Sequence, residues 1–165
     1  MTDSGLALDK ATHYAYRLLA ARPLSEKEFR DKLRVKGFGS SVVETVGARL
    51  KELGYLNDLS YAGQWARTLA VNRLWGNHRI EMRLKGKGLS RELIQEAIAW
   101  AREEITEREA IVKLLGNKGK GQGIAPKDNK EKGRLIRSLM GKGFPPGLIF
   151  EVLSISGEEE VYDGE

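Results

Sequence analysis

One apolar template occurs three times along this chain. Each copy centres on a Lys-Gly step followed by a large apolar residue: Lys36-Gly37-Phe38, Lys87-Gly88-Leu89 and Lys142-Gly143-Phe144. Apolar residues precede each glycine by eight and four positions, and others follow it by five, six and nine positions. The glycines recur at intervals of roughly 50 residues, which is typical of an array of similar supersecondary units.

The template predicts a helix, a tight turn and a second helix in each copy. Apolar residues four positions apart before the glycine make one helical face, and those after it make another. Glycine suits the residue after a helix C-terminus because that residue adopts positive φ. Since a further helical pattern precedes each copy, we expect an all-α protein of three tandem three-helix repeats, similar to helix-turn-helix units.

Local signals set the expected boundaries: repeat 1 at residues 6–56, repeat 2 at 57–104 and repeat 3 at 105–156. Ser25 with Glu28, and Thr106 with Glu109, have the spacing of capping boxes that begin helices. The alternative to a break near Thr106 is one continuous helix over residues 93–115. Residues 116–129 are rich in glycine and lysine, which predicts a flexible basic insertion, and residues 157–165 are expected to form an acidic disordered tail.

Composition excludes several kinds of chemistry. The chain has no cysteine, and its two histidines, His13 and His78, fall in different repeats and cannot alone form a zinc site. The segment Gly119-Lys120-Gly121-Gln122-Gly123 lacks the Lys-Ser or Lys-Thr pair and the preceding strand of a phosphate-binding loop. We therefore expect no catalytic site, no metal site and no cofactor, and a protein that is not an enzyme.

The segments before the three glycines are electropositive. Residues 25–36, 77–87 and 127–142 hold fifteen basic and six acidic residues, whereas residues 40–53, 90–104 and 147–155 hold four basic and seven acidic. In a helix-turn-helix protein the last helix enters the DNA major groove. Here that helix is the acidic one, with Glu44, Glu92 and Glu96, and phosphates would repel it. Sequence-specific DNA reading is therefore disfavoured.

The basic residues of the middle helices are the candidate binding residues. A basic stripe through successive repeats predicts a polyanionic partner or an acidic protein surface, and the alternative is that these residues are solvated faces of amphipathic helices. The candidates are Arg30, Arg34, Lys36, Arg73, Arg79, Arg83, Lys85, Lys87, Arg134, Arg137 and Lys142. We expect a cytoplasmic monomer without a membrane partner, because no stretch approaches the roughly 18 apolar residues of a membrane span.

Three segments resemble the RecX family, the regulators of the bacterial RecA recombinase. The first holds Arg22-Pro23-Leu24-Ser25, Leu33 and Lys36-Gly37-Phe38. The second runs from Leu50-Lys51-Glu52-Leu53-Gly54 through Tyr55-Leu56-Asn57-Asp58 to Tyr61-Ala62. The third holds Gly76, Arg79-Ile80, Leu84 and Lys87-Gly88-Leu89. Two features depart from the family pattern, namely Arg83, where an acidic residue is common, and the long glycine-rich insertion.

The resemblance implies an elongated, curved array. It also implies a function that composition cannot give, which is inhibition of RecA by binding in the groove of its filament on single-stranded DNA. Such binding limits filament extension, ATP hydrolysis and strand exchange, and some family members also bind single- or double-stranded DNA. The alternative is a helical-repeat protein that binds nucleic acid without sequence specificity and has no recombinase partner. A pure protein scaffold is a third possibility.

Overall fold

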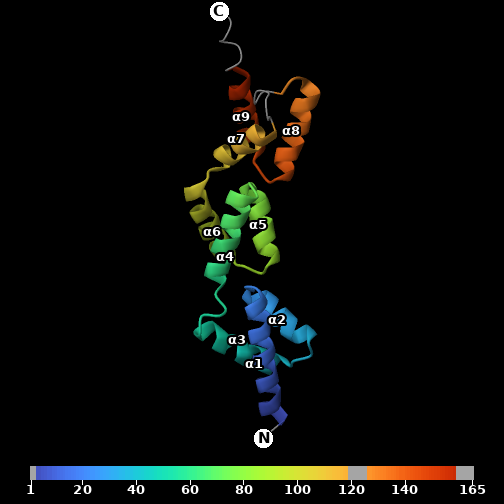
Figure 1. Ribbon diagram of the computed structural model, residues 1–165, viewed down its shortest axis with the longest axis vertical. Coiled ribbons are helices and arrows are strands. Elements are labelled where there is room, and N and C mark those ends of the chain that lie inside the picture. The colour runs from blue at the N-terminus through green and yellow to red at the C-terminus, as the bar shows by residue number, and fades with distance from the viewer. Residues whose placement is uncertain (1–2, 119–125, 159–165) are drawn as a thin grey trace, which may run out of the picture.

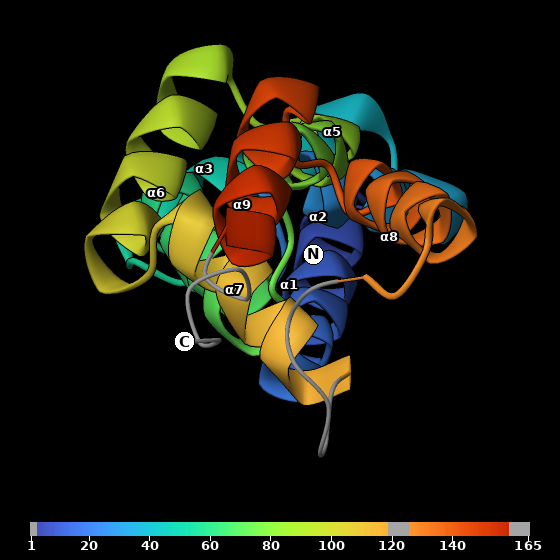
Figure 2. The same cartoon turned by 90° about the horizontal axis from the view of Figure 1, so that it is seen from above.

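A computed structural model describes residues 3–118 and 126–158. The described part is elongated, with its first and last helices at opposite ends (Figure 1). The described residues are helical throughout, without a strand. They form three groups of three helices stacked along the long axis, and a view down that axis shows the groups overlapping (Figure 2). The expected all-α array of three-helix repeats is confirmed.

Each repeat holds a first, a middle and a last helix. Repeat 1 contains α1 (Asp3–Ala21), α2 (Glu26–Val35) and α3 (Ser40–Glu52). Repeat 2 contains α4 (Asp58–Arg67), extended by the π-helical turn η1 (Thr68–Asn72), then α5 (Asn77–Gly86) and α6 (Arg91–Glu104). Repeat 3 contains α7 (Glu107–Lys118), α8 (Asn129–Gly141) and α9 (Pro146–Glu158).

The predicted helix signals act as expected. Gly37, Gly88 and Gly143 have φ of +102°, +76° and +92°, and each follows the C-cap of a middle helix. Ser25 and Glu28 form both bonds of a capping box at the start of α2. Thr106 and Glu109 do the same at α7, where the Glu109 N–H donates to Thr106 Oγ1 at 3.2 Å and the Thr106 N–H donates to Glu109 Oε2 at 2.7 Å. The alternative of one continuous helix over residues 93–115 is therefore wrong.

Several boundaries differ from expectation. The first helix of repeat 2 ends before Gly76, because η1 and Leu74, at φ +53°, turn the chain earlier. That strained conformation places the Leu74 side chain in the core, only 7% exposed. α7 continues through Gly116 to Lys118 and α9 continues to Glu158, so the insertion and the tail begin later than expected. The flexibility predicted for residues 119–125 and 159–165 falls outside the described residues.

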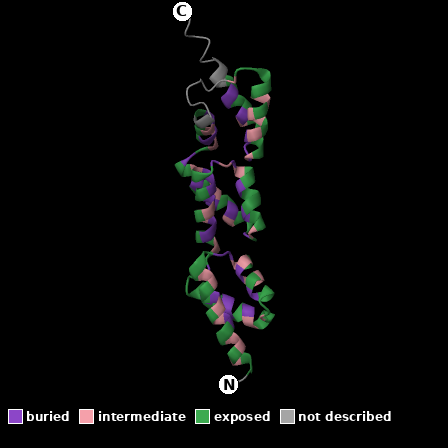
Figure 3. Ribbon diagram, turned by 45° about the vertical axis from the view of Figure 1, so that its right-hand side comes forward, coloured by how far each residue is buried: buried purple, intermediate pink, exposed green. Residues whose placement is uncertain are grey.

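Two hydrophobic cores hold the repeats. One belongs to repeat 1 and contains Phe29, Leu33, Val43 and Leu50. The other runs without interruption through repeats 2 and 3, from Tyr61 to Leu153. The buried residues follow the inner side of each helix along the molecule (Figure 3).

The middle helices stack end to end, so that the N-terminus of one meets the C-terminus of the next. At the first joint Ser25 Oγ donates to the Lys87 carbonyl at 2.7 Å, and the Glu26 N–H donates to Asp58 Oδ1 at 2.9 Å. At the second joint the Gly76 N–H donates to the Lys142 carbonyl at 2.8 Å, and the Asn77 N–H donates to Glu107 Oε1 at 2.8 Å. Helix ends that lack internal partners thereby cap each other, with their dipoles aligned.

Candidate interaction surface

The stacking of α2, α5 and α8 places the three electropositive segments along one side of the array (Figure 1). The candidate basic residues on these helices fall into three groups. Some pair with acids inside repeat 1, some hold a joint together, and some extend into solvent. The groups differ in whether a partner could use their charge.

Two of the three candidate residues of repeat 1 are paired with acids of the same repeat. Arg30 lies 3.2 Å from Glu44 and 3.3 Å from Glu26. Arg34 lies 3.7 Å from Glu44 and 3.8 Å from Asp31. Lys36 is exposed at the end of α2, with its ammonium 5.5 Å from the centre of the Tyr14 ring. The last helix of this repeat therefore offsets the charge of the middle one.

Lys87 belongs to the first joint rather than to an open surface. Its ammonium lies 2.5 Å from Glu28 Oε1, and its side chain is only 19% exposed. The Tyr61 hydroxyl donates to the other carboxylate oxygen of Glu28 at 2.9 Å, and the Ser25 N–H donates to that same oxygen at 3.3 Å. Glu28 thus accepts hydrogen bonds from the N-cap of α2, from α4 and from the C-cap of α5.

This network shifts two pKa values in opposite directions. Partial burial by itself would raise the pKa of Glu28, but the bonds from Lys87, Tyr61 and the Ser25 N–H outweigh it and lower the pKa from 4.5 to about 2. Burial, followed by the bond to Glu28 and its negative charge, raises the pKa of Tyr61 from 10.0 to about 12. At neutral pH the carboxylate is ionised and the phenol is neutral.

Two further candidates lie over tryptophans of repeat 2. The Arg79 guanidinium lies 3.9 Å from the centre of the Trp75 ring and donates to the Gly141 carbonyl of repeat 3 at 3.3 Å. The Arg83 guanidinium lies 5.7 Å from the centre of the Trp65 ring. Such cation–π contacts fix the direction of a long side chain. The four-residue spacing of Trp75 and Arg79 could have indicated the first contact, but no local spacing relates Trp65 to Arg83.

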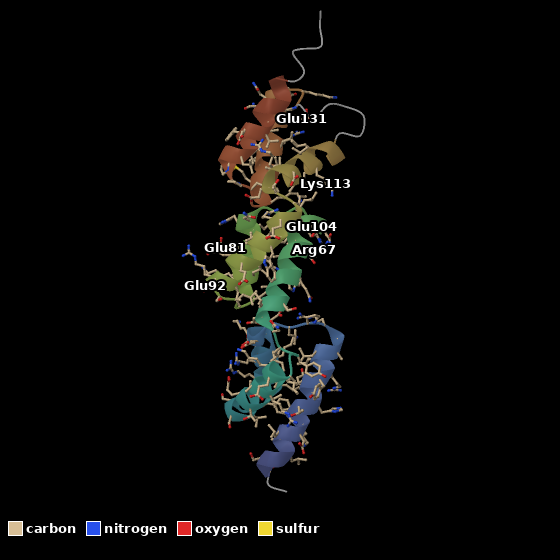
Figure 4. The ribbon with its side chains drawn as sticks, turned by 90° about the vertical axis from the view of Figure 1, so that its left-hand side faces the viewer. Arg67, Glu81, Glu92, Glu104, Lys113 and Glu131 are labelled. Carbon is tan, nitrogen blue, oxygen red and sulfur yellow. The ribbon has the colours of Figure 1, made fainter. Side chains whose placement is uncertain are left out.

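Four candidates are exposed and form neither an ion pair nor a cation–π contact within residues 3–118 and 126–158. We call them the unpaired bases, and they are Arg73 after η1, Lys85 on α5, and Arg134 and Arg137 on α8. Lys142, the C-cap of α8, is half-buried beside the second joint. By contrast Arg67, which was not a candidate, makes a bidentate ion pair with Glu104, both bonds measuring 2.7 Å (Figure 4).

Arg102 is a half-buried cation that the sequence did not reveal. It donates to Asn77 Oδ1 at 2.6 Å, to the Trp75 carbonyl at 2.7 Å and to the Ile105 carbonyl at 3.2 Å. Burial lowers its pKa, and the charge of Glu107 partly opposes that shift. Arg102 therefore ties the start of α5 to the turn between α6 and α7, and its role is structural.

Within the described part of the chain, no group of three or more His, Asp or Glu side chains could hold a metal ion. None of the described helices is long and apolar enough to cross a membrane.

Family models match all three repeats. Residues 11–50 match RecX, first three-helix domain; residues 57–98 match RecX, second three-helix domain; and residues 107–153 match RecX, third three-helix domain. The chain belongs to the RecX family. It is 32% identical to the regulatory protein RecX of Thermus thermophilus over 150 residues, which cover 91% of this chain and 94% of that one. It is 35% identical to the regulatory protein RecX of Thermotoga petrophila, over 94% and 90% of the two chains.

Solved structures agree in fold. A crystal structure of RecX from Lactobacillus salivarius superposes with a TM-score of 0.78 at 21% identity, over 93% of this chain and 98% of that chain. Proteins of the RecX family are regulatory proteins and not enzymes, so the expectation that this chain is not an enzyme is confirmed by its family.

Proposed function

We propose that this protein inhibits the bacterial RecA recombinase by binding in the groove of the filament that RecA forms on single-stranded DNA. Bound there, it limits filament extension, ATP hydrolysis and strand exchange. The unpaired bases of repeats 2 and 3 supply the contact to acidic protein surface or to DNA phosphate. Of the candidates in repeat 1, Arg30 and Arg34 are already paired with acids of the same repeat.

The observation that carries this proposal is the end-to-end stacking of the middle helices. It aligns the basic segments of α5 and α8, because the Gly76 N–H donates to the Lys142 carbonyl and the Asn77 N–H donates to Glu107 Oε1. An elongated array presents an extended surface of this kind to a filament. Arg73, Lys85, Arg134 and Arg137 meet no carboxylate in the described chain, so binding them breaks no ion pair.

A second candidate function is binding of nucleic acid without a recombinase partner. The tryptophans beneath Arg79 and Arg83 favour it, because aromatic and cationic side chains together suit single-stranded nucleic acid. This function predicts affinity for bare DNA that falls steeply with salt concentration. A pure scaffold predicts neither this affinity nor an effect on RecA.

The test is the rate of ATP hydrolysis by RecA from the same organism on single-stranded DNA, titrated with this protein. Arg79, Arg83 and Lys87 are unsuitable for charge reversal as a set, because Arg79 and Lys87 lie in the two joints. The triple variant Lys85→Glu, Arg134→Glu and Arg137→Glu avoids the joints. We expect inhibition by the native protein and at least about a tenfold loss of potency in the variant, which loses several contacts worth roughly 0.5–1 kcal/mol each.

A matched control reverses three exposed bases elsewhere: Lys10→Glu on α1, Arg49→Glu on α3 and Lys113→Glu on α7. It changes net charge by the same amount and should inhibit RecA like the native protein. Equal loss in both triple variants would mean that overall charge, not this surface, governs inhibition. Absence of inhibition, with salt-sensitive binding to bare DNA, would favour the second function.

A further inference from the structure

A groove of about 480 Å³ lies at the second joint, where α5 meets the turn that leads into α9. Repeat 2 contributes Asn77, His78 and Glu81 to its lining, and repeat 3 contributes Glu107, Met140 and the segment Gly143-Phe144-Pro145-Pro146. The groove therefore exists only because the two repeats are docked.

The groove has apolar walls and an acidic rim. Met140, 49% exposed, lies with Phe144 and the two prolines on the repeat 3 side. Glu81 and Glu107 approach from two different helices, and neither forms an ion pair in the described chain. Glu107 is held in place because it accepts the Asn77 N–H at 2.8 Å. Two carboxylates beside apolar side chains suit a side chain that is apolar along its stem and cationic at its end.

A lysine covers the corresponding glycine at the first joint. Counted from the glycines, His78 and Gly143 of the second joint match Lys27 and Gly88 of the first. The Lys27 stem lies directly over Gly88, since a Cβ added to that glycine would come within 2.3 Å of Lys27 Cδ. The Lys27 ammonium then pairs with Asp31 at 2.7 Å. The first joint thus supplies its own lysine, whereas the second has a histidine and an open groove.

We propose that this groove binds a lysine or arginine side chain of a partner protein. The methylene stem lies against Met140, Phe144 and Pro145, and the cationic end meets Glu81 and Glu107. The volume of about 480 Å³ exceeds that of one side chain, so the residues that flank the cation in the partner enter as well. This site is opposite in charge to the unpaired bases, and the inference does not rest on the proposed function.

The experiment is a ¹H–¹⁵N NMR titration of the full chain with two peptides. One is acetyl-Ala-Leu-Arg-Leu-Ala-amide, and the other has glutamine in place of arginine. We expect the arginine peptide to shift the amide signals of His78, Gly143 and Phe144 and to bind about fivefold more tightly than the glutamine peptide, as expected for partly exposed ion pairs. Equal binding of the two peptides, no binding, or shifts confined to other residues would overturn the proposal.

Two variants test the site itself. Glu81→Gln removes one carboxylate, and His78→Lys supplies the lysine that the first joint already accommodates; each should weaken the arginine peptide about fivefold. The control is Glu92→Gln on α6, an exposed carboxylate farther from repeat 3 than Glu81 (Figure 4). It should leave the affinity unchanged. Unchanged affinity in both Glu81→Gln and His78→Lys would also overturn the proposal.

Discussion

The two joints of the array cap equivalent backbone groups but are surrounded by different chemistry. At the first joint a carboxylate, a lysine and a tyrosine meet in a half-buried network, and the cores on either side stay separate. At the second joint two glycines bring backbones together, and one apolar core passes through. The same pair of capped helix ends can therefore connect two repeats either through polar groups alone or through a shared apolar core.

The largest effect is expected from Gly76→Ala at the second joint. Gly76 has φ −74°, which any residue adopts, so alanine there introduces a steric contact without backbone strain. An added Cβ would lie 2.3 Å from the carbonyl carbon of Gly143, a backbone atom that cannot move independently of repeat 3. We expect a loss of about 3 kcal/mol or more in the free energy of unfolding, measured by denaturant titration.

Gly86→Ala in the same helix is the control for Gly76→Ala. An added Cβ there meets nothing within 4 Å, and alanine should stabilise the helix by up to about 1 kcal/mol. If Gly76→Ala proved as stable as the native protein, the close backbone contact at the second joint would be refuted.

A smaller, local effect is expected from Glu28→Gln at the first joint. The amide keeps the size of the side chain but loses the ion pair with Lys87, so we expect a loss of about 2 kcal/mol. Because the cores are separate, hydrogen exchange should accelerate in repeat 1 and near Lys87 while α8 and α9 keep their protection. Equal acceleration in repeat 3 would show that all three repeats unfold as one unit.

Acid should weaken the same joint. The folded pKa of Glu28, about 2, lies below its ordinary value of 4.5, so the ionised carboxylate stabilises the folded state. That contribution is complete above pH 4.5 and is lost as the pH falls toward 2. The thermal unfolding temperature of the native protein should fall over this pH range more than that of Glu28→Gln. Equal falls in the two proteins would contradict a lowered pKa of Glu28.

The smallest effect is expected from Gly37→Ala in repeat 1, at a turn that is not docked against another repeat. An added Cβ would meet nothing within 4 Å, so the cost is only that of placing alanine at positive φ, roughly 1–2 kcal/mol. Gly143→Ala carries the same strain plus a clash with Arg79, whose backbone nitrogen would lie 2.4 Å from the added atom. If denaturant titration showed that Gly37→Ala lowers the free energy of unfolding as much as Gly143→Ala does, the distinction between a free turn and a docked turn would be refuted.

The middle helix of repeat 3 begins earlier than those of the other two repeats. α2 and α5 begin 11 residues before their glycines, at Glu26 and Asn77, whereas α8 begins 14 residues before its glycine, at Asn129. The start of α8 is capped locally, since the Glu131 N–H donates to Asp128 Oδ1 at 2.7 Å.

The sequence by itself determined the repeat, the three glycine turns and the two predicted capping boxes. Each depends on residues within a few positions of one another, and the physical preferences that govern them are local. The same locality explains the boundary errors. The sequence around Gly76 and Gly116 indicated breaks, but burial of Leu74 ended one helix earlier, and burial of Ile111 and Leu115 accompanied the continuation of the other.

Only the tertiary structure decided which basic residues carry usable charge. Arg30 and Lys87 looked alike in the sequence, yet one pairs with Glu44 across its own repeat and the other with Glu28 across a joint. Lys85 and Arg137 are exposed and unpaired in the described chain. These outcomes depend on how each repeat is rotated against the next. That rotation is set by contacts between residues about 60 positions apart, such as Ser25 with Lys87, which no local pattern encodes.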